Sequence, residues 1–169
     1  MNLEFIHLLP PDFSPNSRVW IYQSNRLFSL SEALDIEAAI NEFCEEWTSH
    51  GAEVKAFGSL FFGQFVVLLT DETAGGVSGC STDSSVRFIK DLGNRYRVDF
   101  FDRMNLAFII KEKVQVLPLS QLQYAIDNNF ITPETLYFNN LVQTKKELEN
   151  NWIIPVSSSW LQQKISASV

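Results

Sequence analysis

Two short segments of this chain are apolar at every position. They are FVVLL at residues 65–69 and LAFII at residues 106–110. Successive side chains of a strand point to opposite faces of its sheet, so two strands of this kind need cover on both faces. The sequence therefore predicts a sheet that carries a packed layer on each side.

The surrounding pattern predicts six elements in the order β-α-β-β-α-β. Strands are expected over residues 18–23, 53–62, 64–71 and 105–112, and helices over residues 30–49 and 83–97. Ser29 or Ser31 can cap the first helix. Gly63 predicts a tight hairpin, and Gly58 is interpreted as a bulge. This order favours a ferredoxin-like core of the α+β class, in which four antiparallel strands form one sheet and two helices cover one face.

The other face of that sheet needs a further layer. Residues 113–169 are expected to supply it as a helical C-terminal extension, with short helices near residues 120–128, 133–138, 141–150 and 157–165. Residues 1–17 are predicted to form an N-terminal arm and residues 18–112 the core, all within a single domain. A homodimer formed through the sheet is the alternative cover.

Composition narrows the class of partner. The chain of 169 residues has a formal net charge of -7, and its 13 Lys and Arg residues are scattered, so the basic surface that binds nucleic acid is not predicted. No apolar run approaches the length that spans a bilayer, and the first residues do not resemble a secretion signal. The two cysteines show no metal-ligand spacing. We expect a soluble, cytoplasmic protein that has no cofactor. We also expect it to bind neither nucleic acid nor membranes.

The segment VSGCSTDSSVRF, residues 77–88, places small and hydroxyl-bearing residues before an apolar helical pattern. Free amide groups at a helix N-terminus carry partial positive charge and attract anions. The sequence therefore predicts a small-anion site at the start of the second helix. Its expected residues are Ser81, Thr82 and Ser84, with Arg87 and Arg18 as basic side chains on the same side of the fold.

The same segment permits two other interpretations. Ser81, Thr82 and Asp83 can each cap the helix by accepting a hydrogen bond from an amide of its first turn, which is the more common role of such clusters. Alternatively, Cys80 beside the helix N-terminus has a lowered thiol pKa and acts as a nucleophile. In the expected topology His50 lies at the same rim of the sheet, so the thiol hypothesis assigns His50 as base and Asp83 or Asp12 as the residue that orients it.

Nucleotide hydrolysis is not predicted from this segment. GGVSGCS, residues 75–81, lacks the Gly-Lys-Ser/Thr ending that a phosphate-binding loop uses to hold phosphate and magnesium. Four stretches carry a family resemblance: SRVWIYQSNRLFS, WTSHG, FVVLLTDETAGGVSGCSTDSSVRFIKDL and VDFFDR. They resemble an uncharacterised bacterial family whose members are often labelled ABC transporter ATPase. The similarity covers most of the chain, and no established activity accompanies it.

Two functions of different classes remain open at this point. The first is a binding or interaction protein that takes a small anionic ligand or a protein partner, as a monomer or a homodimer. The second is a thiol-dependent enzyme that uses Cys80 and His50. They differ in what they need, because an enzyme requires an accessible sulfur close to an imidazole nitrogen, whereas a binding protein does not.

Overall fold

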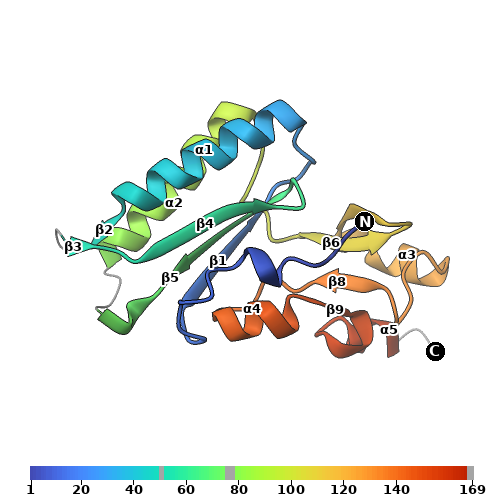
Figure 1. Ribbon diagram of the computed structural model, residues 1–169. Helices are drawn as coiled ribbons and strands as arrows, with labels where there is room; N and C mark the ends of the chain where they lie inside the picture. Colours follow the sequence, from blue (N-terminus) through green and yellow to red (C-terminus); the bar gives the residue numbers. More distant parts are fainter. Residues whose placement is uncertain (50–51, 75–78, 167–169) are drawn as a thin grey trace.

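The computed structural model describes residues 1–49, 52–74 and 79–166 (Figure 1). The first part of the chain contains β1 (Arg18–Gln23), α1 (Leu30–Glu46), β2 (Thr48–Ser49), β3 (Ala52–Glu53), β4 (Ala56–Phe61), β5 (Phe65–Thr70) and α2 (Gly79–Tyr96). The second part contains β6 (Asn105–Ile110), β7 (Lys113–Pro118), α3 (Leu122–Asp127), β8 (Leu136–Phe138), α4 (Lys145–Asn151), β9 (Ile153–Pro155) and α5 (Gln162–Ser166).

The larger strands form two antiparallel sheets. The first sheet has the order β1-β5-β4, and the second has the order β7-β6-β8-β9. The mixed α and β composition and the antiparallel pairing agree with the sequence prediction. In the first sheet, β1 and β4 run parallel on either side of β5, which is the pairing that a split β-α-β unit followed by a hairpin produces.

The ferredoxin-like core is not confirmed. In that fold the strand after the second helix returns to lie beside β1, but β6 pairs with β7 and β8 in the second sheet. The chain turns back directly after β6 through Lys111 and Glu112, whose φ angles are 51° and 59°. Two successive residues with positive φ make the tight turn that suits a hairpin. Local pairing with β7 therefore replaces the long-range pairing with β1.

The C-terminal extension contains more strand than predicted. Helices α3, α4 and α5 fall in or next to three of the expected helical pieces, but residues 133–138, predicted as a helix, include strand β8. Strands β7 and β9 were also not predicted as strands. Because β8 and β9 have three residues each and pair with strands distant in sequence, their conformation depends on neighbours that a local pattern does not contain.

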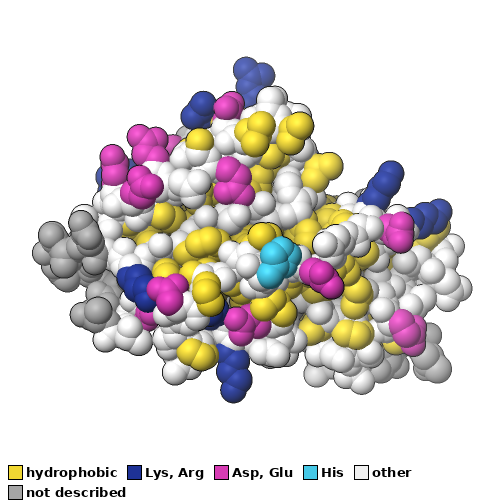
Figure 2. Space-filling model, in the orientation of Figure 1, with side chains coloured by type: hydrophobic (Ala, Val, Ile, Leu, Met, Phe, Trp, Pro, Cys, Tyr) yellow, Lys and Arg dark blue, Asp and Glu magenta, His cyan; other side chains and the backbone are white. Residues whose placement is uncertain are grey.

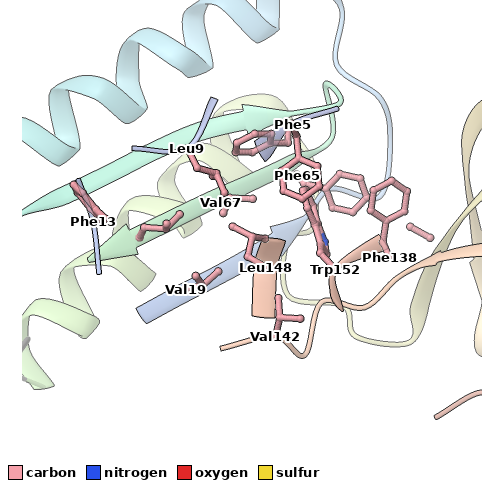
Figure 3. Packing of buried hydrophobic residues seen from close by; sticks show 13 residues of the cluster. Phe5, Leu9, Phe13, Val19, Phe65, Val67, Phe138, Val142, Leu148 and Trp152 are labelled. Atoms are coloured by element: carbon pink, nitrogen blue, oxygen red, sulfur yellow. The ribbon is translucent and has the colours of Figure 1, made fainter. Parts of the chain in front are cut away.

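Both faces of the first sheet are covered, as the apolar strands require. All six residues of β5 are buried. Helices α1 and α2 lie on one face, and α4 with the N-terminal arm lies on the other (Figure 1). On that second face Phe5 of the arm, Phe65 of β5 and Phe138 of β8 surround Trp152 (Figure 3). The face that suggested a homodimer is therefore covered within one chain.

The structure tests the predicted helix cap at Ser29 or Ser31 and the predicted bulge at Gly58. Ser29 caps α1 and forms a capping box with Glu32, as one of the two predicted caps. Gly58 is not a bulge, since β4 and β5 pair without interruption through Gly58 and Leu68. Its role is close packing, because a Cβ atom at Gly58 would lie 2.5 Å from Cγ2 of Ile40 on α1. The missing side chain lets the helix approach the sheet.

Candidate functional site

The residues predicted as an anion or thiol site lie at the start of α2. This helix begins at Gly79 rather than near residue 83, so Thr82, Asp83 and Ser84 already lie within its first turns. Ser85 reinforces this conformation, because its hydroxyl is buried and donates to the carbonyl of Thr82 at 2.7 Å. The free amide groups of the helix terminus consequently belong to earlier residues than the sequence suggested.

The thiol pair falls outside the part of the chain that the structure describes. His50 lies outside the described part of the chain, as do the side chains of Cys80 and Ser81. Asp83 is exposed on the helix surface. The Cys80–His50 pair, with Asp83 as its third member, therefore stays a prediction.

The two arginines assigned to the anion site differ in their surroundings. Arg87 is exposed on α2. Arg18 contacts a carboxylate, since its Nη1 lies 3.4 Å from Oε1 of Glu72, and its guanidinium lies over the ring of Trp20 at 4.9 Å. Figure 2 shows Lys and Arg side chains scattered among Asp and Glu on the face that it displays. An anion at the start of α2 would therefore compete with Glu72 for Arg18.

A groove along the outer edge of β1 is a candidate site that the sequence did not indicate. Its volume is about 320 Å³. It lies where a ferredoxin-like fold would place the fourth strand, between β1 and the second sheet. The lining comes from residues 19–23 of β1, residues 100–103, Asn105 and Leu106, residues 137–138, residues 140–143, and Trp160. We call it the β1 groove.

The floor of the β1 groove is an open strand edge. The amide of Val19 donates to the carbonyl of Gln143 at 2.9 Å, which shows that odd-numbered residues of β1 point their backbone groups away from β5. Lys145 donates in turn to Ser17, so a short antiparallel bridge covers the beginning of this edge. Beyond it, no described residue makes a hydrogen bond with the outward N–H and C=O groups of Ile21.

Other sheet edges are protected in ways that β1 is not. On the outer edge of β4, the carboxylate of Glu37 accepts from the amide of Leu60 at 2.8 Å. Strand β7 begins with Lys113 and ends with Pro118, two residue types that discourage further pairing. The bridge to residues 143–145 does not reach Ile21, so the strand edge at Ile21 is uncovered and faces the β1 groove. Such an edge is a template for another strand.

One end of the β1 groove is closed by a chain of side-chain hydrogen bonds. Nε1 of Trp152 donates to Asn140 at 3.0 Å, and Asn140 donates to Oε1 of Gln23 at 2.8 Å. Gln23 then donates to the carbonyl of Asn105 at 3.1 Å. The chain ties the last residue of β1 to β6 and to the segment after β8. Because Gln23 is buried, these bonds hold the two walls of the groove at a fixed separation.

The rim of the β1 groove is aromatic and apolar. Phe101 and Trp160 are each 42% exposed, and Leu141 is 61% exposed. The Phe101 ring packs against Tyr22 at 5.7 Å, and Nε1 of Trp160 donates to the hydroxyl of Tyr137 at 3.3 Å. Aromatic side chains that are partly buried and held in place are typical contact residues of protein interfaces.

The titratable groups of the groove are suited to binding rather than to acid–base catalysis. Burial raises the pKa of Tyr22 and of Tyr137, so both phenols stay neutral. Both carboxylate oxygens of Asp102 accept hydrogen bonds within its own loop, from Met104 and Asn105. Arg103 is exposed and has no ion pair with any described residue. The groove therefore offers apolar surface, backbone hydrogen bonds, the negative charge of Asp102, which is engaged within its own loop, and the positive charge of Arg103.

The other cysteine of the chain is a packing residue. Burial raises the pKa of Cys44 to about 12. Its sulfur would lie 3.0 Å from a Cβ atom at Gly58, which places the thiol between α1 and β4. A thiol with so high a pKa has almost no thiolate at neutral pH and is a poor nucleophile.

Within residues 1–49, 52–74 and 79–166, no three His, Cys, Asp or Glu side chains gather as metal ligands would. No helix in the same part of the chain has the length and apolar character needed to cross a bilayer. Comparisons of the chain with protein-family models, with curated proteins and with solved structures find no match.

Proposed function

We propose that this chain is a binding protein, and that the β1 groove holds an extended peptide segment of a protein partner. The observation that carries the proposal is the unpaired backbone edge at Ile21, which lies on the floor of a groove rimmed by Phe101, Leu141 and Trp160. An extended peptide offers what this surface lacks, because it brings both backbone hydrogen-bonding groups and apolar side chains.

The chemistry of the groove supports a peptide better than a small anion. A small anion could use Arg103, but it would leave the apolar rim and the backbone groups of Ile21 without partners. Exposed apolar patches with a polar surround commonly mark protein interaction sites. The anion site at the start of α2 and the Cys80–His50 enzyme stay separate predictions, and neither depends on the β1 groove.

Selection from a random-peptide phage library tests the proposal. The wild-type protein is the target, and Trp160→Ala is the variant that removes the exposed indole from the rim. Tyr124→Ala is the matched control, because Tyr124 is an exposed aromatic residue on α3 that does not line the groove. Truncation of a tryptophan that anchors an interface costs about 2 kcal/mol or more, so Trp160→Ala should weaken a selected peptide roughly 30-fold.

The control variant should bind the selected peptide with wild-type affinity. Circular dichroism of both variants should match the wild-type spectrum, which separates loss of binding from loss of fold. Equal binding to wild type and Trp160→Ala would contradict the proposal. A library that yields no peptide dependent on the groove would contradict it as well.

A further inference from the structure

The open edge of β1 also constrains how a peptide would be held. We infer that the bound segment adds to the first sheet as a strand antiparallel to β1 and opposite Ile21, with an apolar residue at that position and an acidic residue beside it. This inference rests on the proposed function, since it specifies the peptide that the β1 groove would take.

The backbone groups for strand addition are already aligned. Ile21 presents an N–H and a C=O to the groove, whereas the place opposite Val19 is already taken by Gln143, whose carbonyl accepts from the Val19 amide. A residue of the peptide placed opposite Ile21 would form both hydrogen bonds of a narrow antiparallel pair. The pairing of the peptide with β1 would stop before Val19, because Gln143 already lies opposite that residue. The sheet thereby gains a short fourth strand at the position left empty by β6.

The direction follows from the chain that already occupies part of this edge. Residues 143–145 run antiparallel to β1, with Thr144 opposite Arg18. Every strand pair in the first sheet is antiparallel as well. An antiparallel peptide would continue the line of this bridge, and its C-terminal end would approach Gln143. The closed end at Gln23 then limits the added strand to a short segment.

The side-chain preferences follow from the two faces of β1. Ile21 and Val19 share one face of β1 and belong to the apolar cluster that includes Val142 and Phe138, so a peptide residue opposite Ile21 would meet apolar surface on that face. Its immediate neighbours would point to the face of Tyr22, where Phe101 packs. Arg103 lines the groove close to Phe101 in sequence, and the carboxylate of Asp102 between them is already engaged by Met104 and Asn105. A carboxylate on a neighbouring residue of the peptide would therefore face an arginine that has no described ion pair.

An ester scan of a library-selected peptide tests this inference. Each backbone amide of the peptide is replaced in turn by an ester, which removes one N–H donor and leaves the side chains unchanged. In a strand, successive N–H groups point to opposite edges. We expect the affinity to fall roughly ten-fold when the amide of the residue opposite Ile21 is replaced, and to stay unchanged when either neighbouring amide is replaced. Hydrogen exchange at the Ile21 amide should slow when the parent peptide is added.

Direction and charge have their own measurements. A paramagnetic label at the C-terminus of the peptide should broaden the amide signal of Gln143 more than that of Asn105, and the reverse would show a parallel strand. Library selection against the Arg103→Gln variant should yield peptides that lack the acidic residue next to the position opposite Ile21.

The outcomes separate the two claims. A peptide whose binding needs Trp160, with a flat ester profile and no protection of Ile21, would overturn strand addition and leave the proposed function in place. If no selected peptide depends on the groove, both claims fail.

Discussion

The packing of Trp152 makes a quantitative prediction about how the two sheets depend on each other. Its side chain is fully buried, and its ring centroid lies 5.0 Å from Phe5, 5.5 Å from Phe65 and 5.5 Å from Phe138. These partners belong to the arm, the first sheet and the second sheet. Replacing a buried tryptophan by alanine typically costs about 3–5 kcal/mol. The change also leaves Oδ1 of Asn140 without its indole donor.

Urea denaturation measures this cost. Total stabilities of domains are about 5–15 kcal/mol, so Trp152→Ala should lose a large fraction of the free energy of unfolding and shift the midpoint strongly. Trp152→Phe is the matched control, because it keeps a ring in the cluster and should lose less, roughly 1–3 kcal/mol for the hydrogen bond and the smaller ring. The wild type should unfold in a single transition. A loss below about 1 kcal/mol in Trp152→Ala, or separate transitions for the two sheets, would refute the shared core.

Three further predictions concern packing, pH and thiol chemistry. Gly58→Ala should destabilise the protein by about 1–3 kcal/mol, because the new Cβ atom would lie 2.5 Å from Ile40 and 2.8 Å from Leu68. An unchanged denaturation midpoint would contradict the close packing of α1 on β4. Hydrogen bonds from Thr73, then from Lys55 and Ser14, hold the pKa of Asp71 below its usual value of 3.8, so the stability advantage of wild type over Asp71→Asn should be full above that pH and shrink as the pH falls further. A stability difference that does not change with pH would contradict this. Iodoacetamide at about pH 8 should leave Cys44 of the folded protein unmodified, which mass spectrometry can show. In the Cys44→Ala variant, the pH dependence of alkylation reports on Cys80 alone. A midpoint at a pH of roughly 8.5 or higher would remove the thiol-enzyme hypothesis.

The elements that sequence reasoning predicted well are those with a strong local period. Strand β1 has the predicted bounds of residues 18–23, and α1 follows its apolar stripe from Leu30 to Glu46. The hairpin of β4 and β5 is marked by Gly63, which has a φ of 63°. In each case the signal lies within a few residues, so it does not depend on how distant segments pack.

The second sheet illustrates what such patterns omit. Its hairpin turns through Lys111 and Glu112, although residues with positive φ are usually glycine, asparagine or aspartate. Nothing in that dipeptide indicates a turn. Strands β8 and β9 are short and gain their hydrogen bonds from each other and from β6. Because the placement of β6 decides the topology, missing these partners led to the ferredoxin-like prediction.

The candidate site could not be predicted for a related reason. The β1 groove is built from β1, the loop that follows α2, the segment that follows β8, and Trp160, which are far apart in sequence. Its main feature is the absence of a neighbouring strand at Ile21, and that follows from topology rather than from residue type. The exposure of Phe101 and Trp160 is equally invisible in a sequence. Sequence reasoning was drawn instead to residues 77–88, where the chemistry-bearing residue types are consecutive.

The most direct test of the account is a heteronuclear NMR titration of the full chain with a library-selected peptide. Amide signals of Ile21, Phe101 and Gln143 should shift together, because these residues line three sides of the β1 groove. Signals of Thr82 and Arg87 at the start of α2 should stay in place. Shifts confined to the start of α2, with Ile21 unchanged, would contradict the assignment of the β1 groove as the binding site.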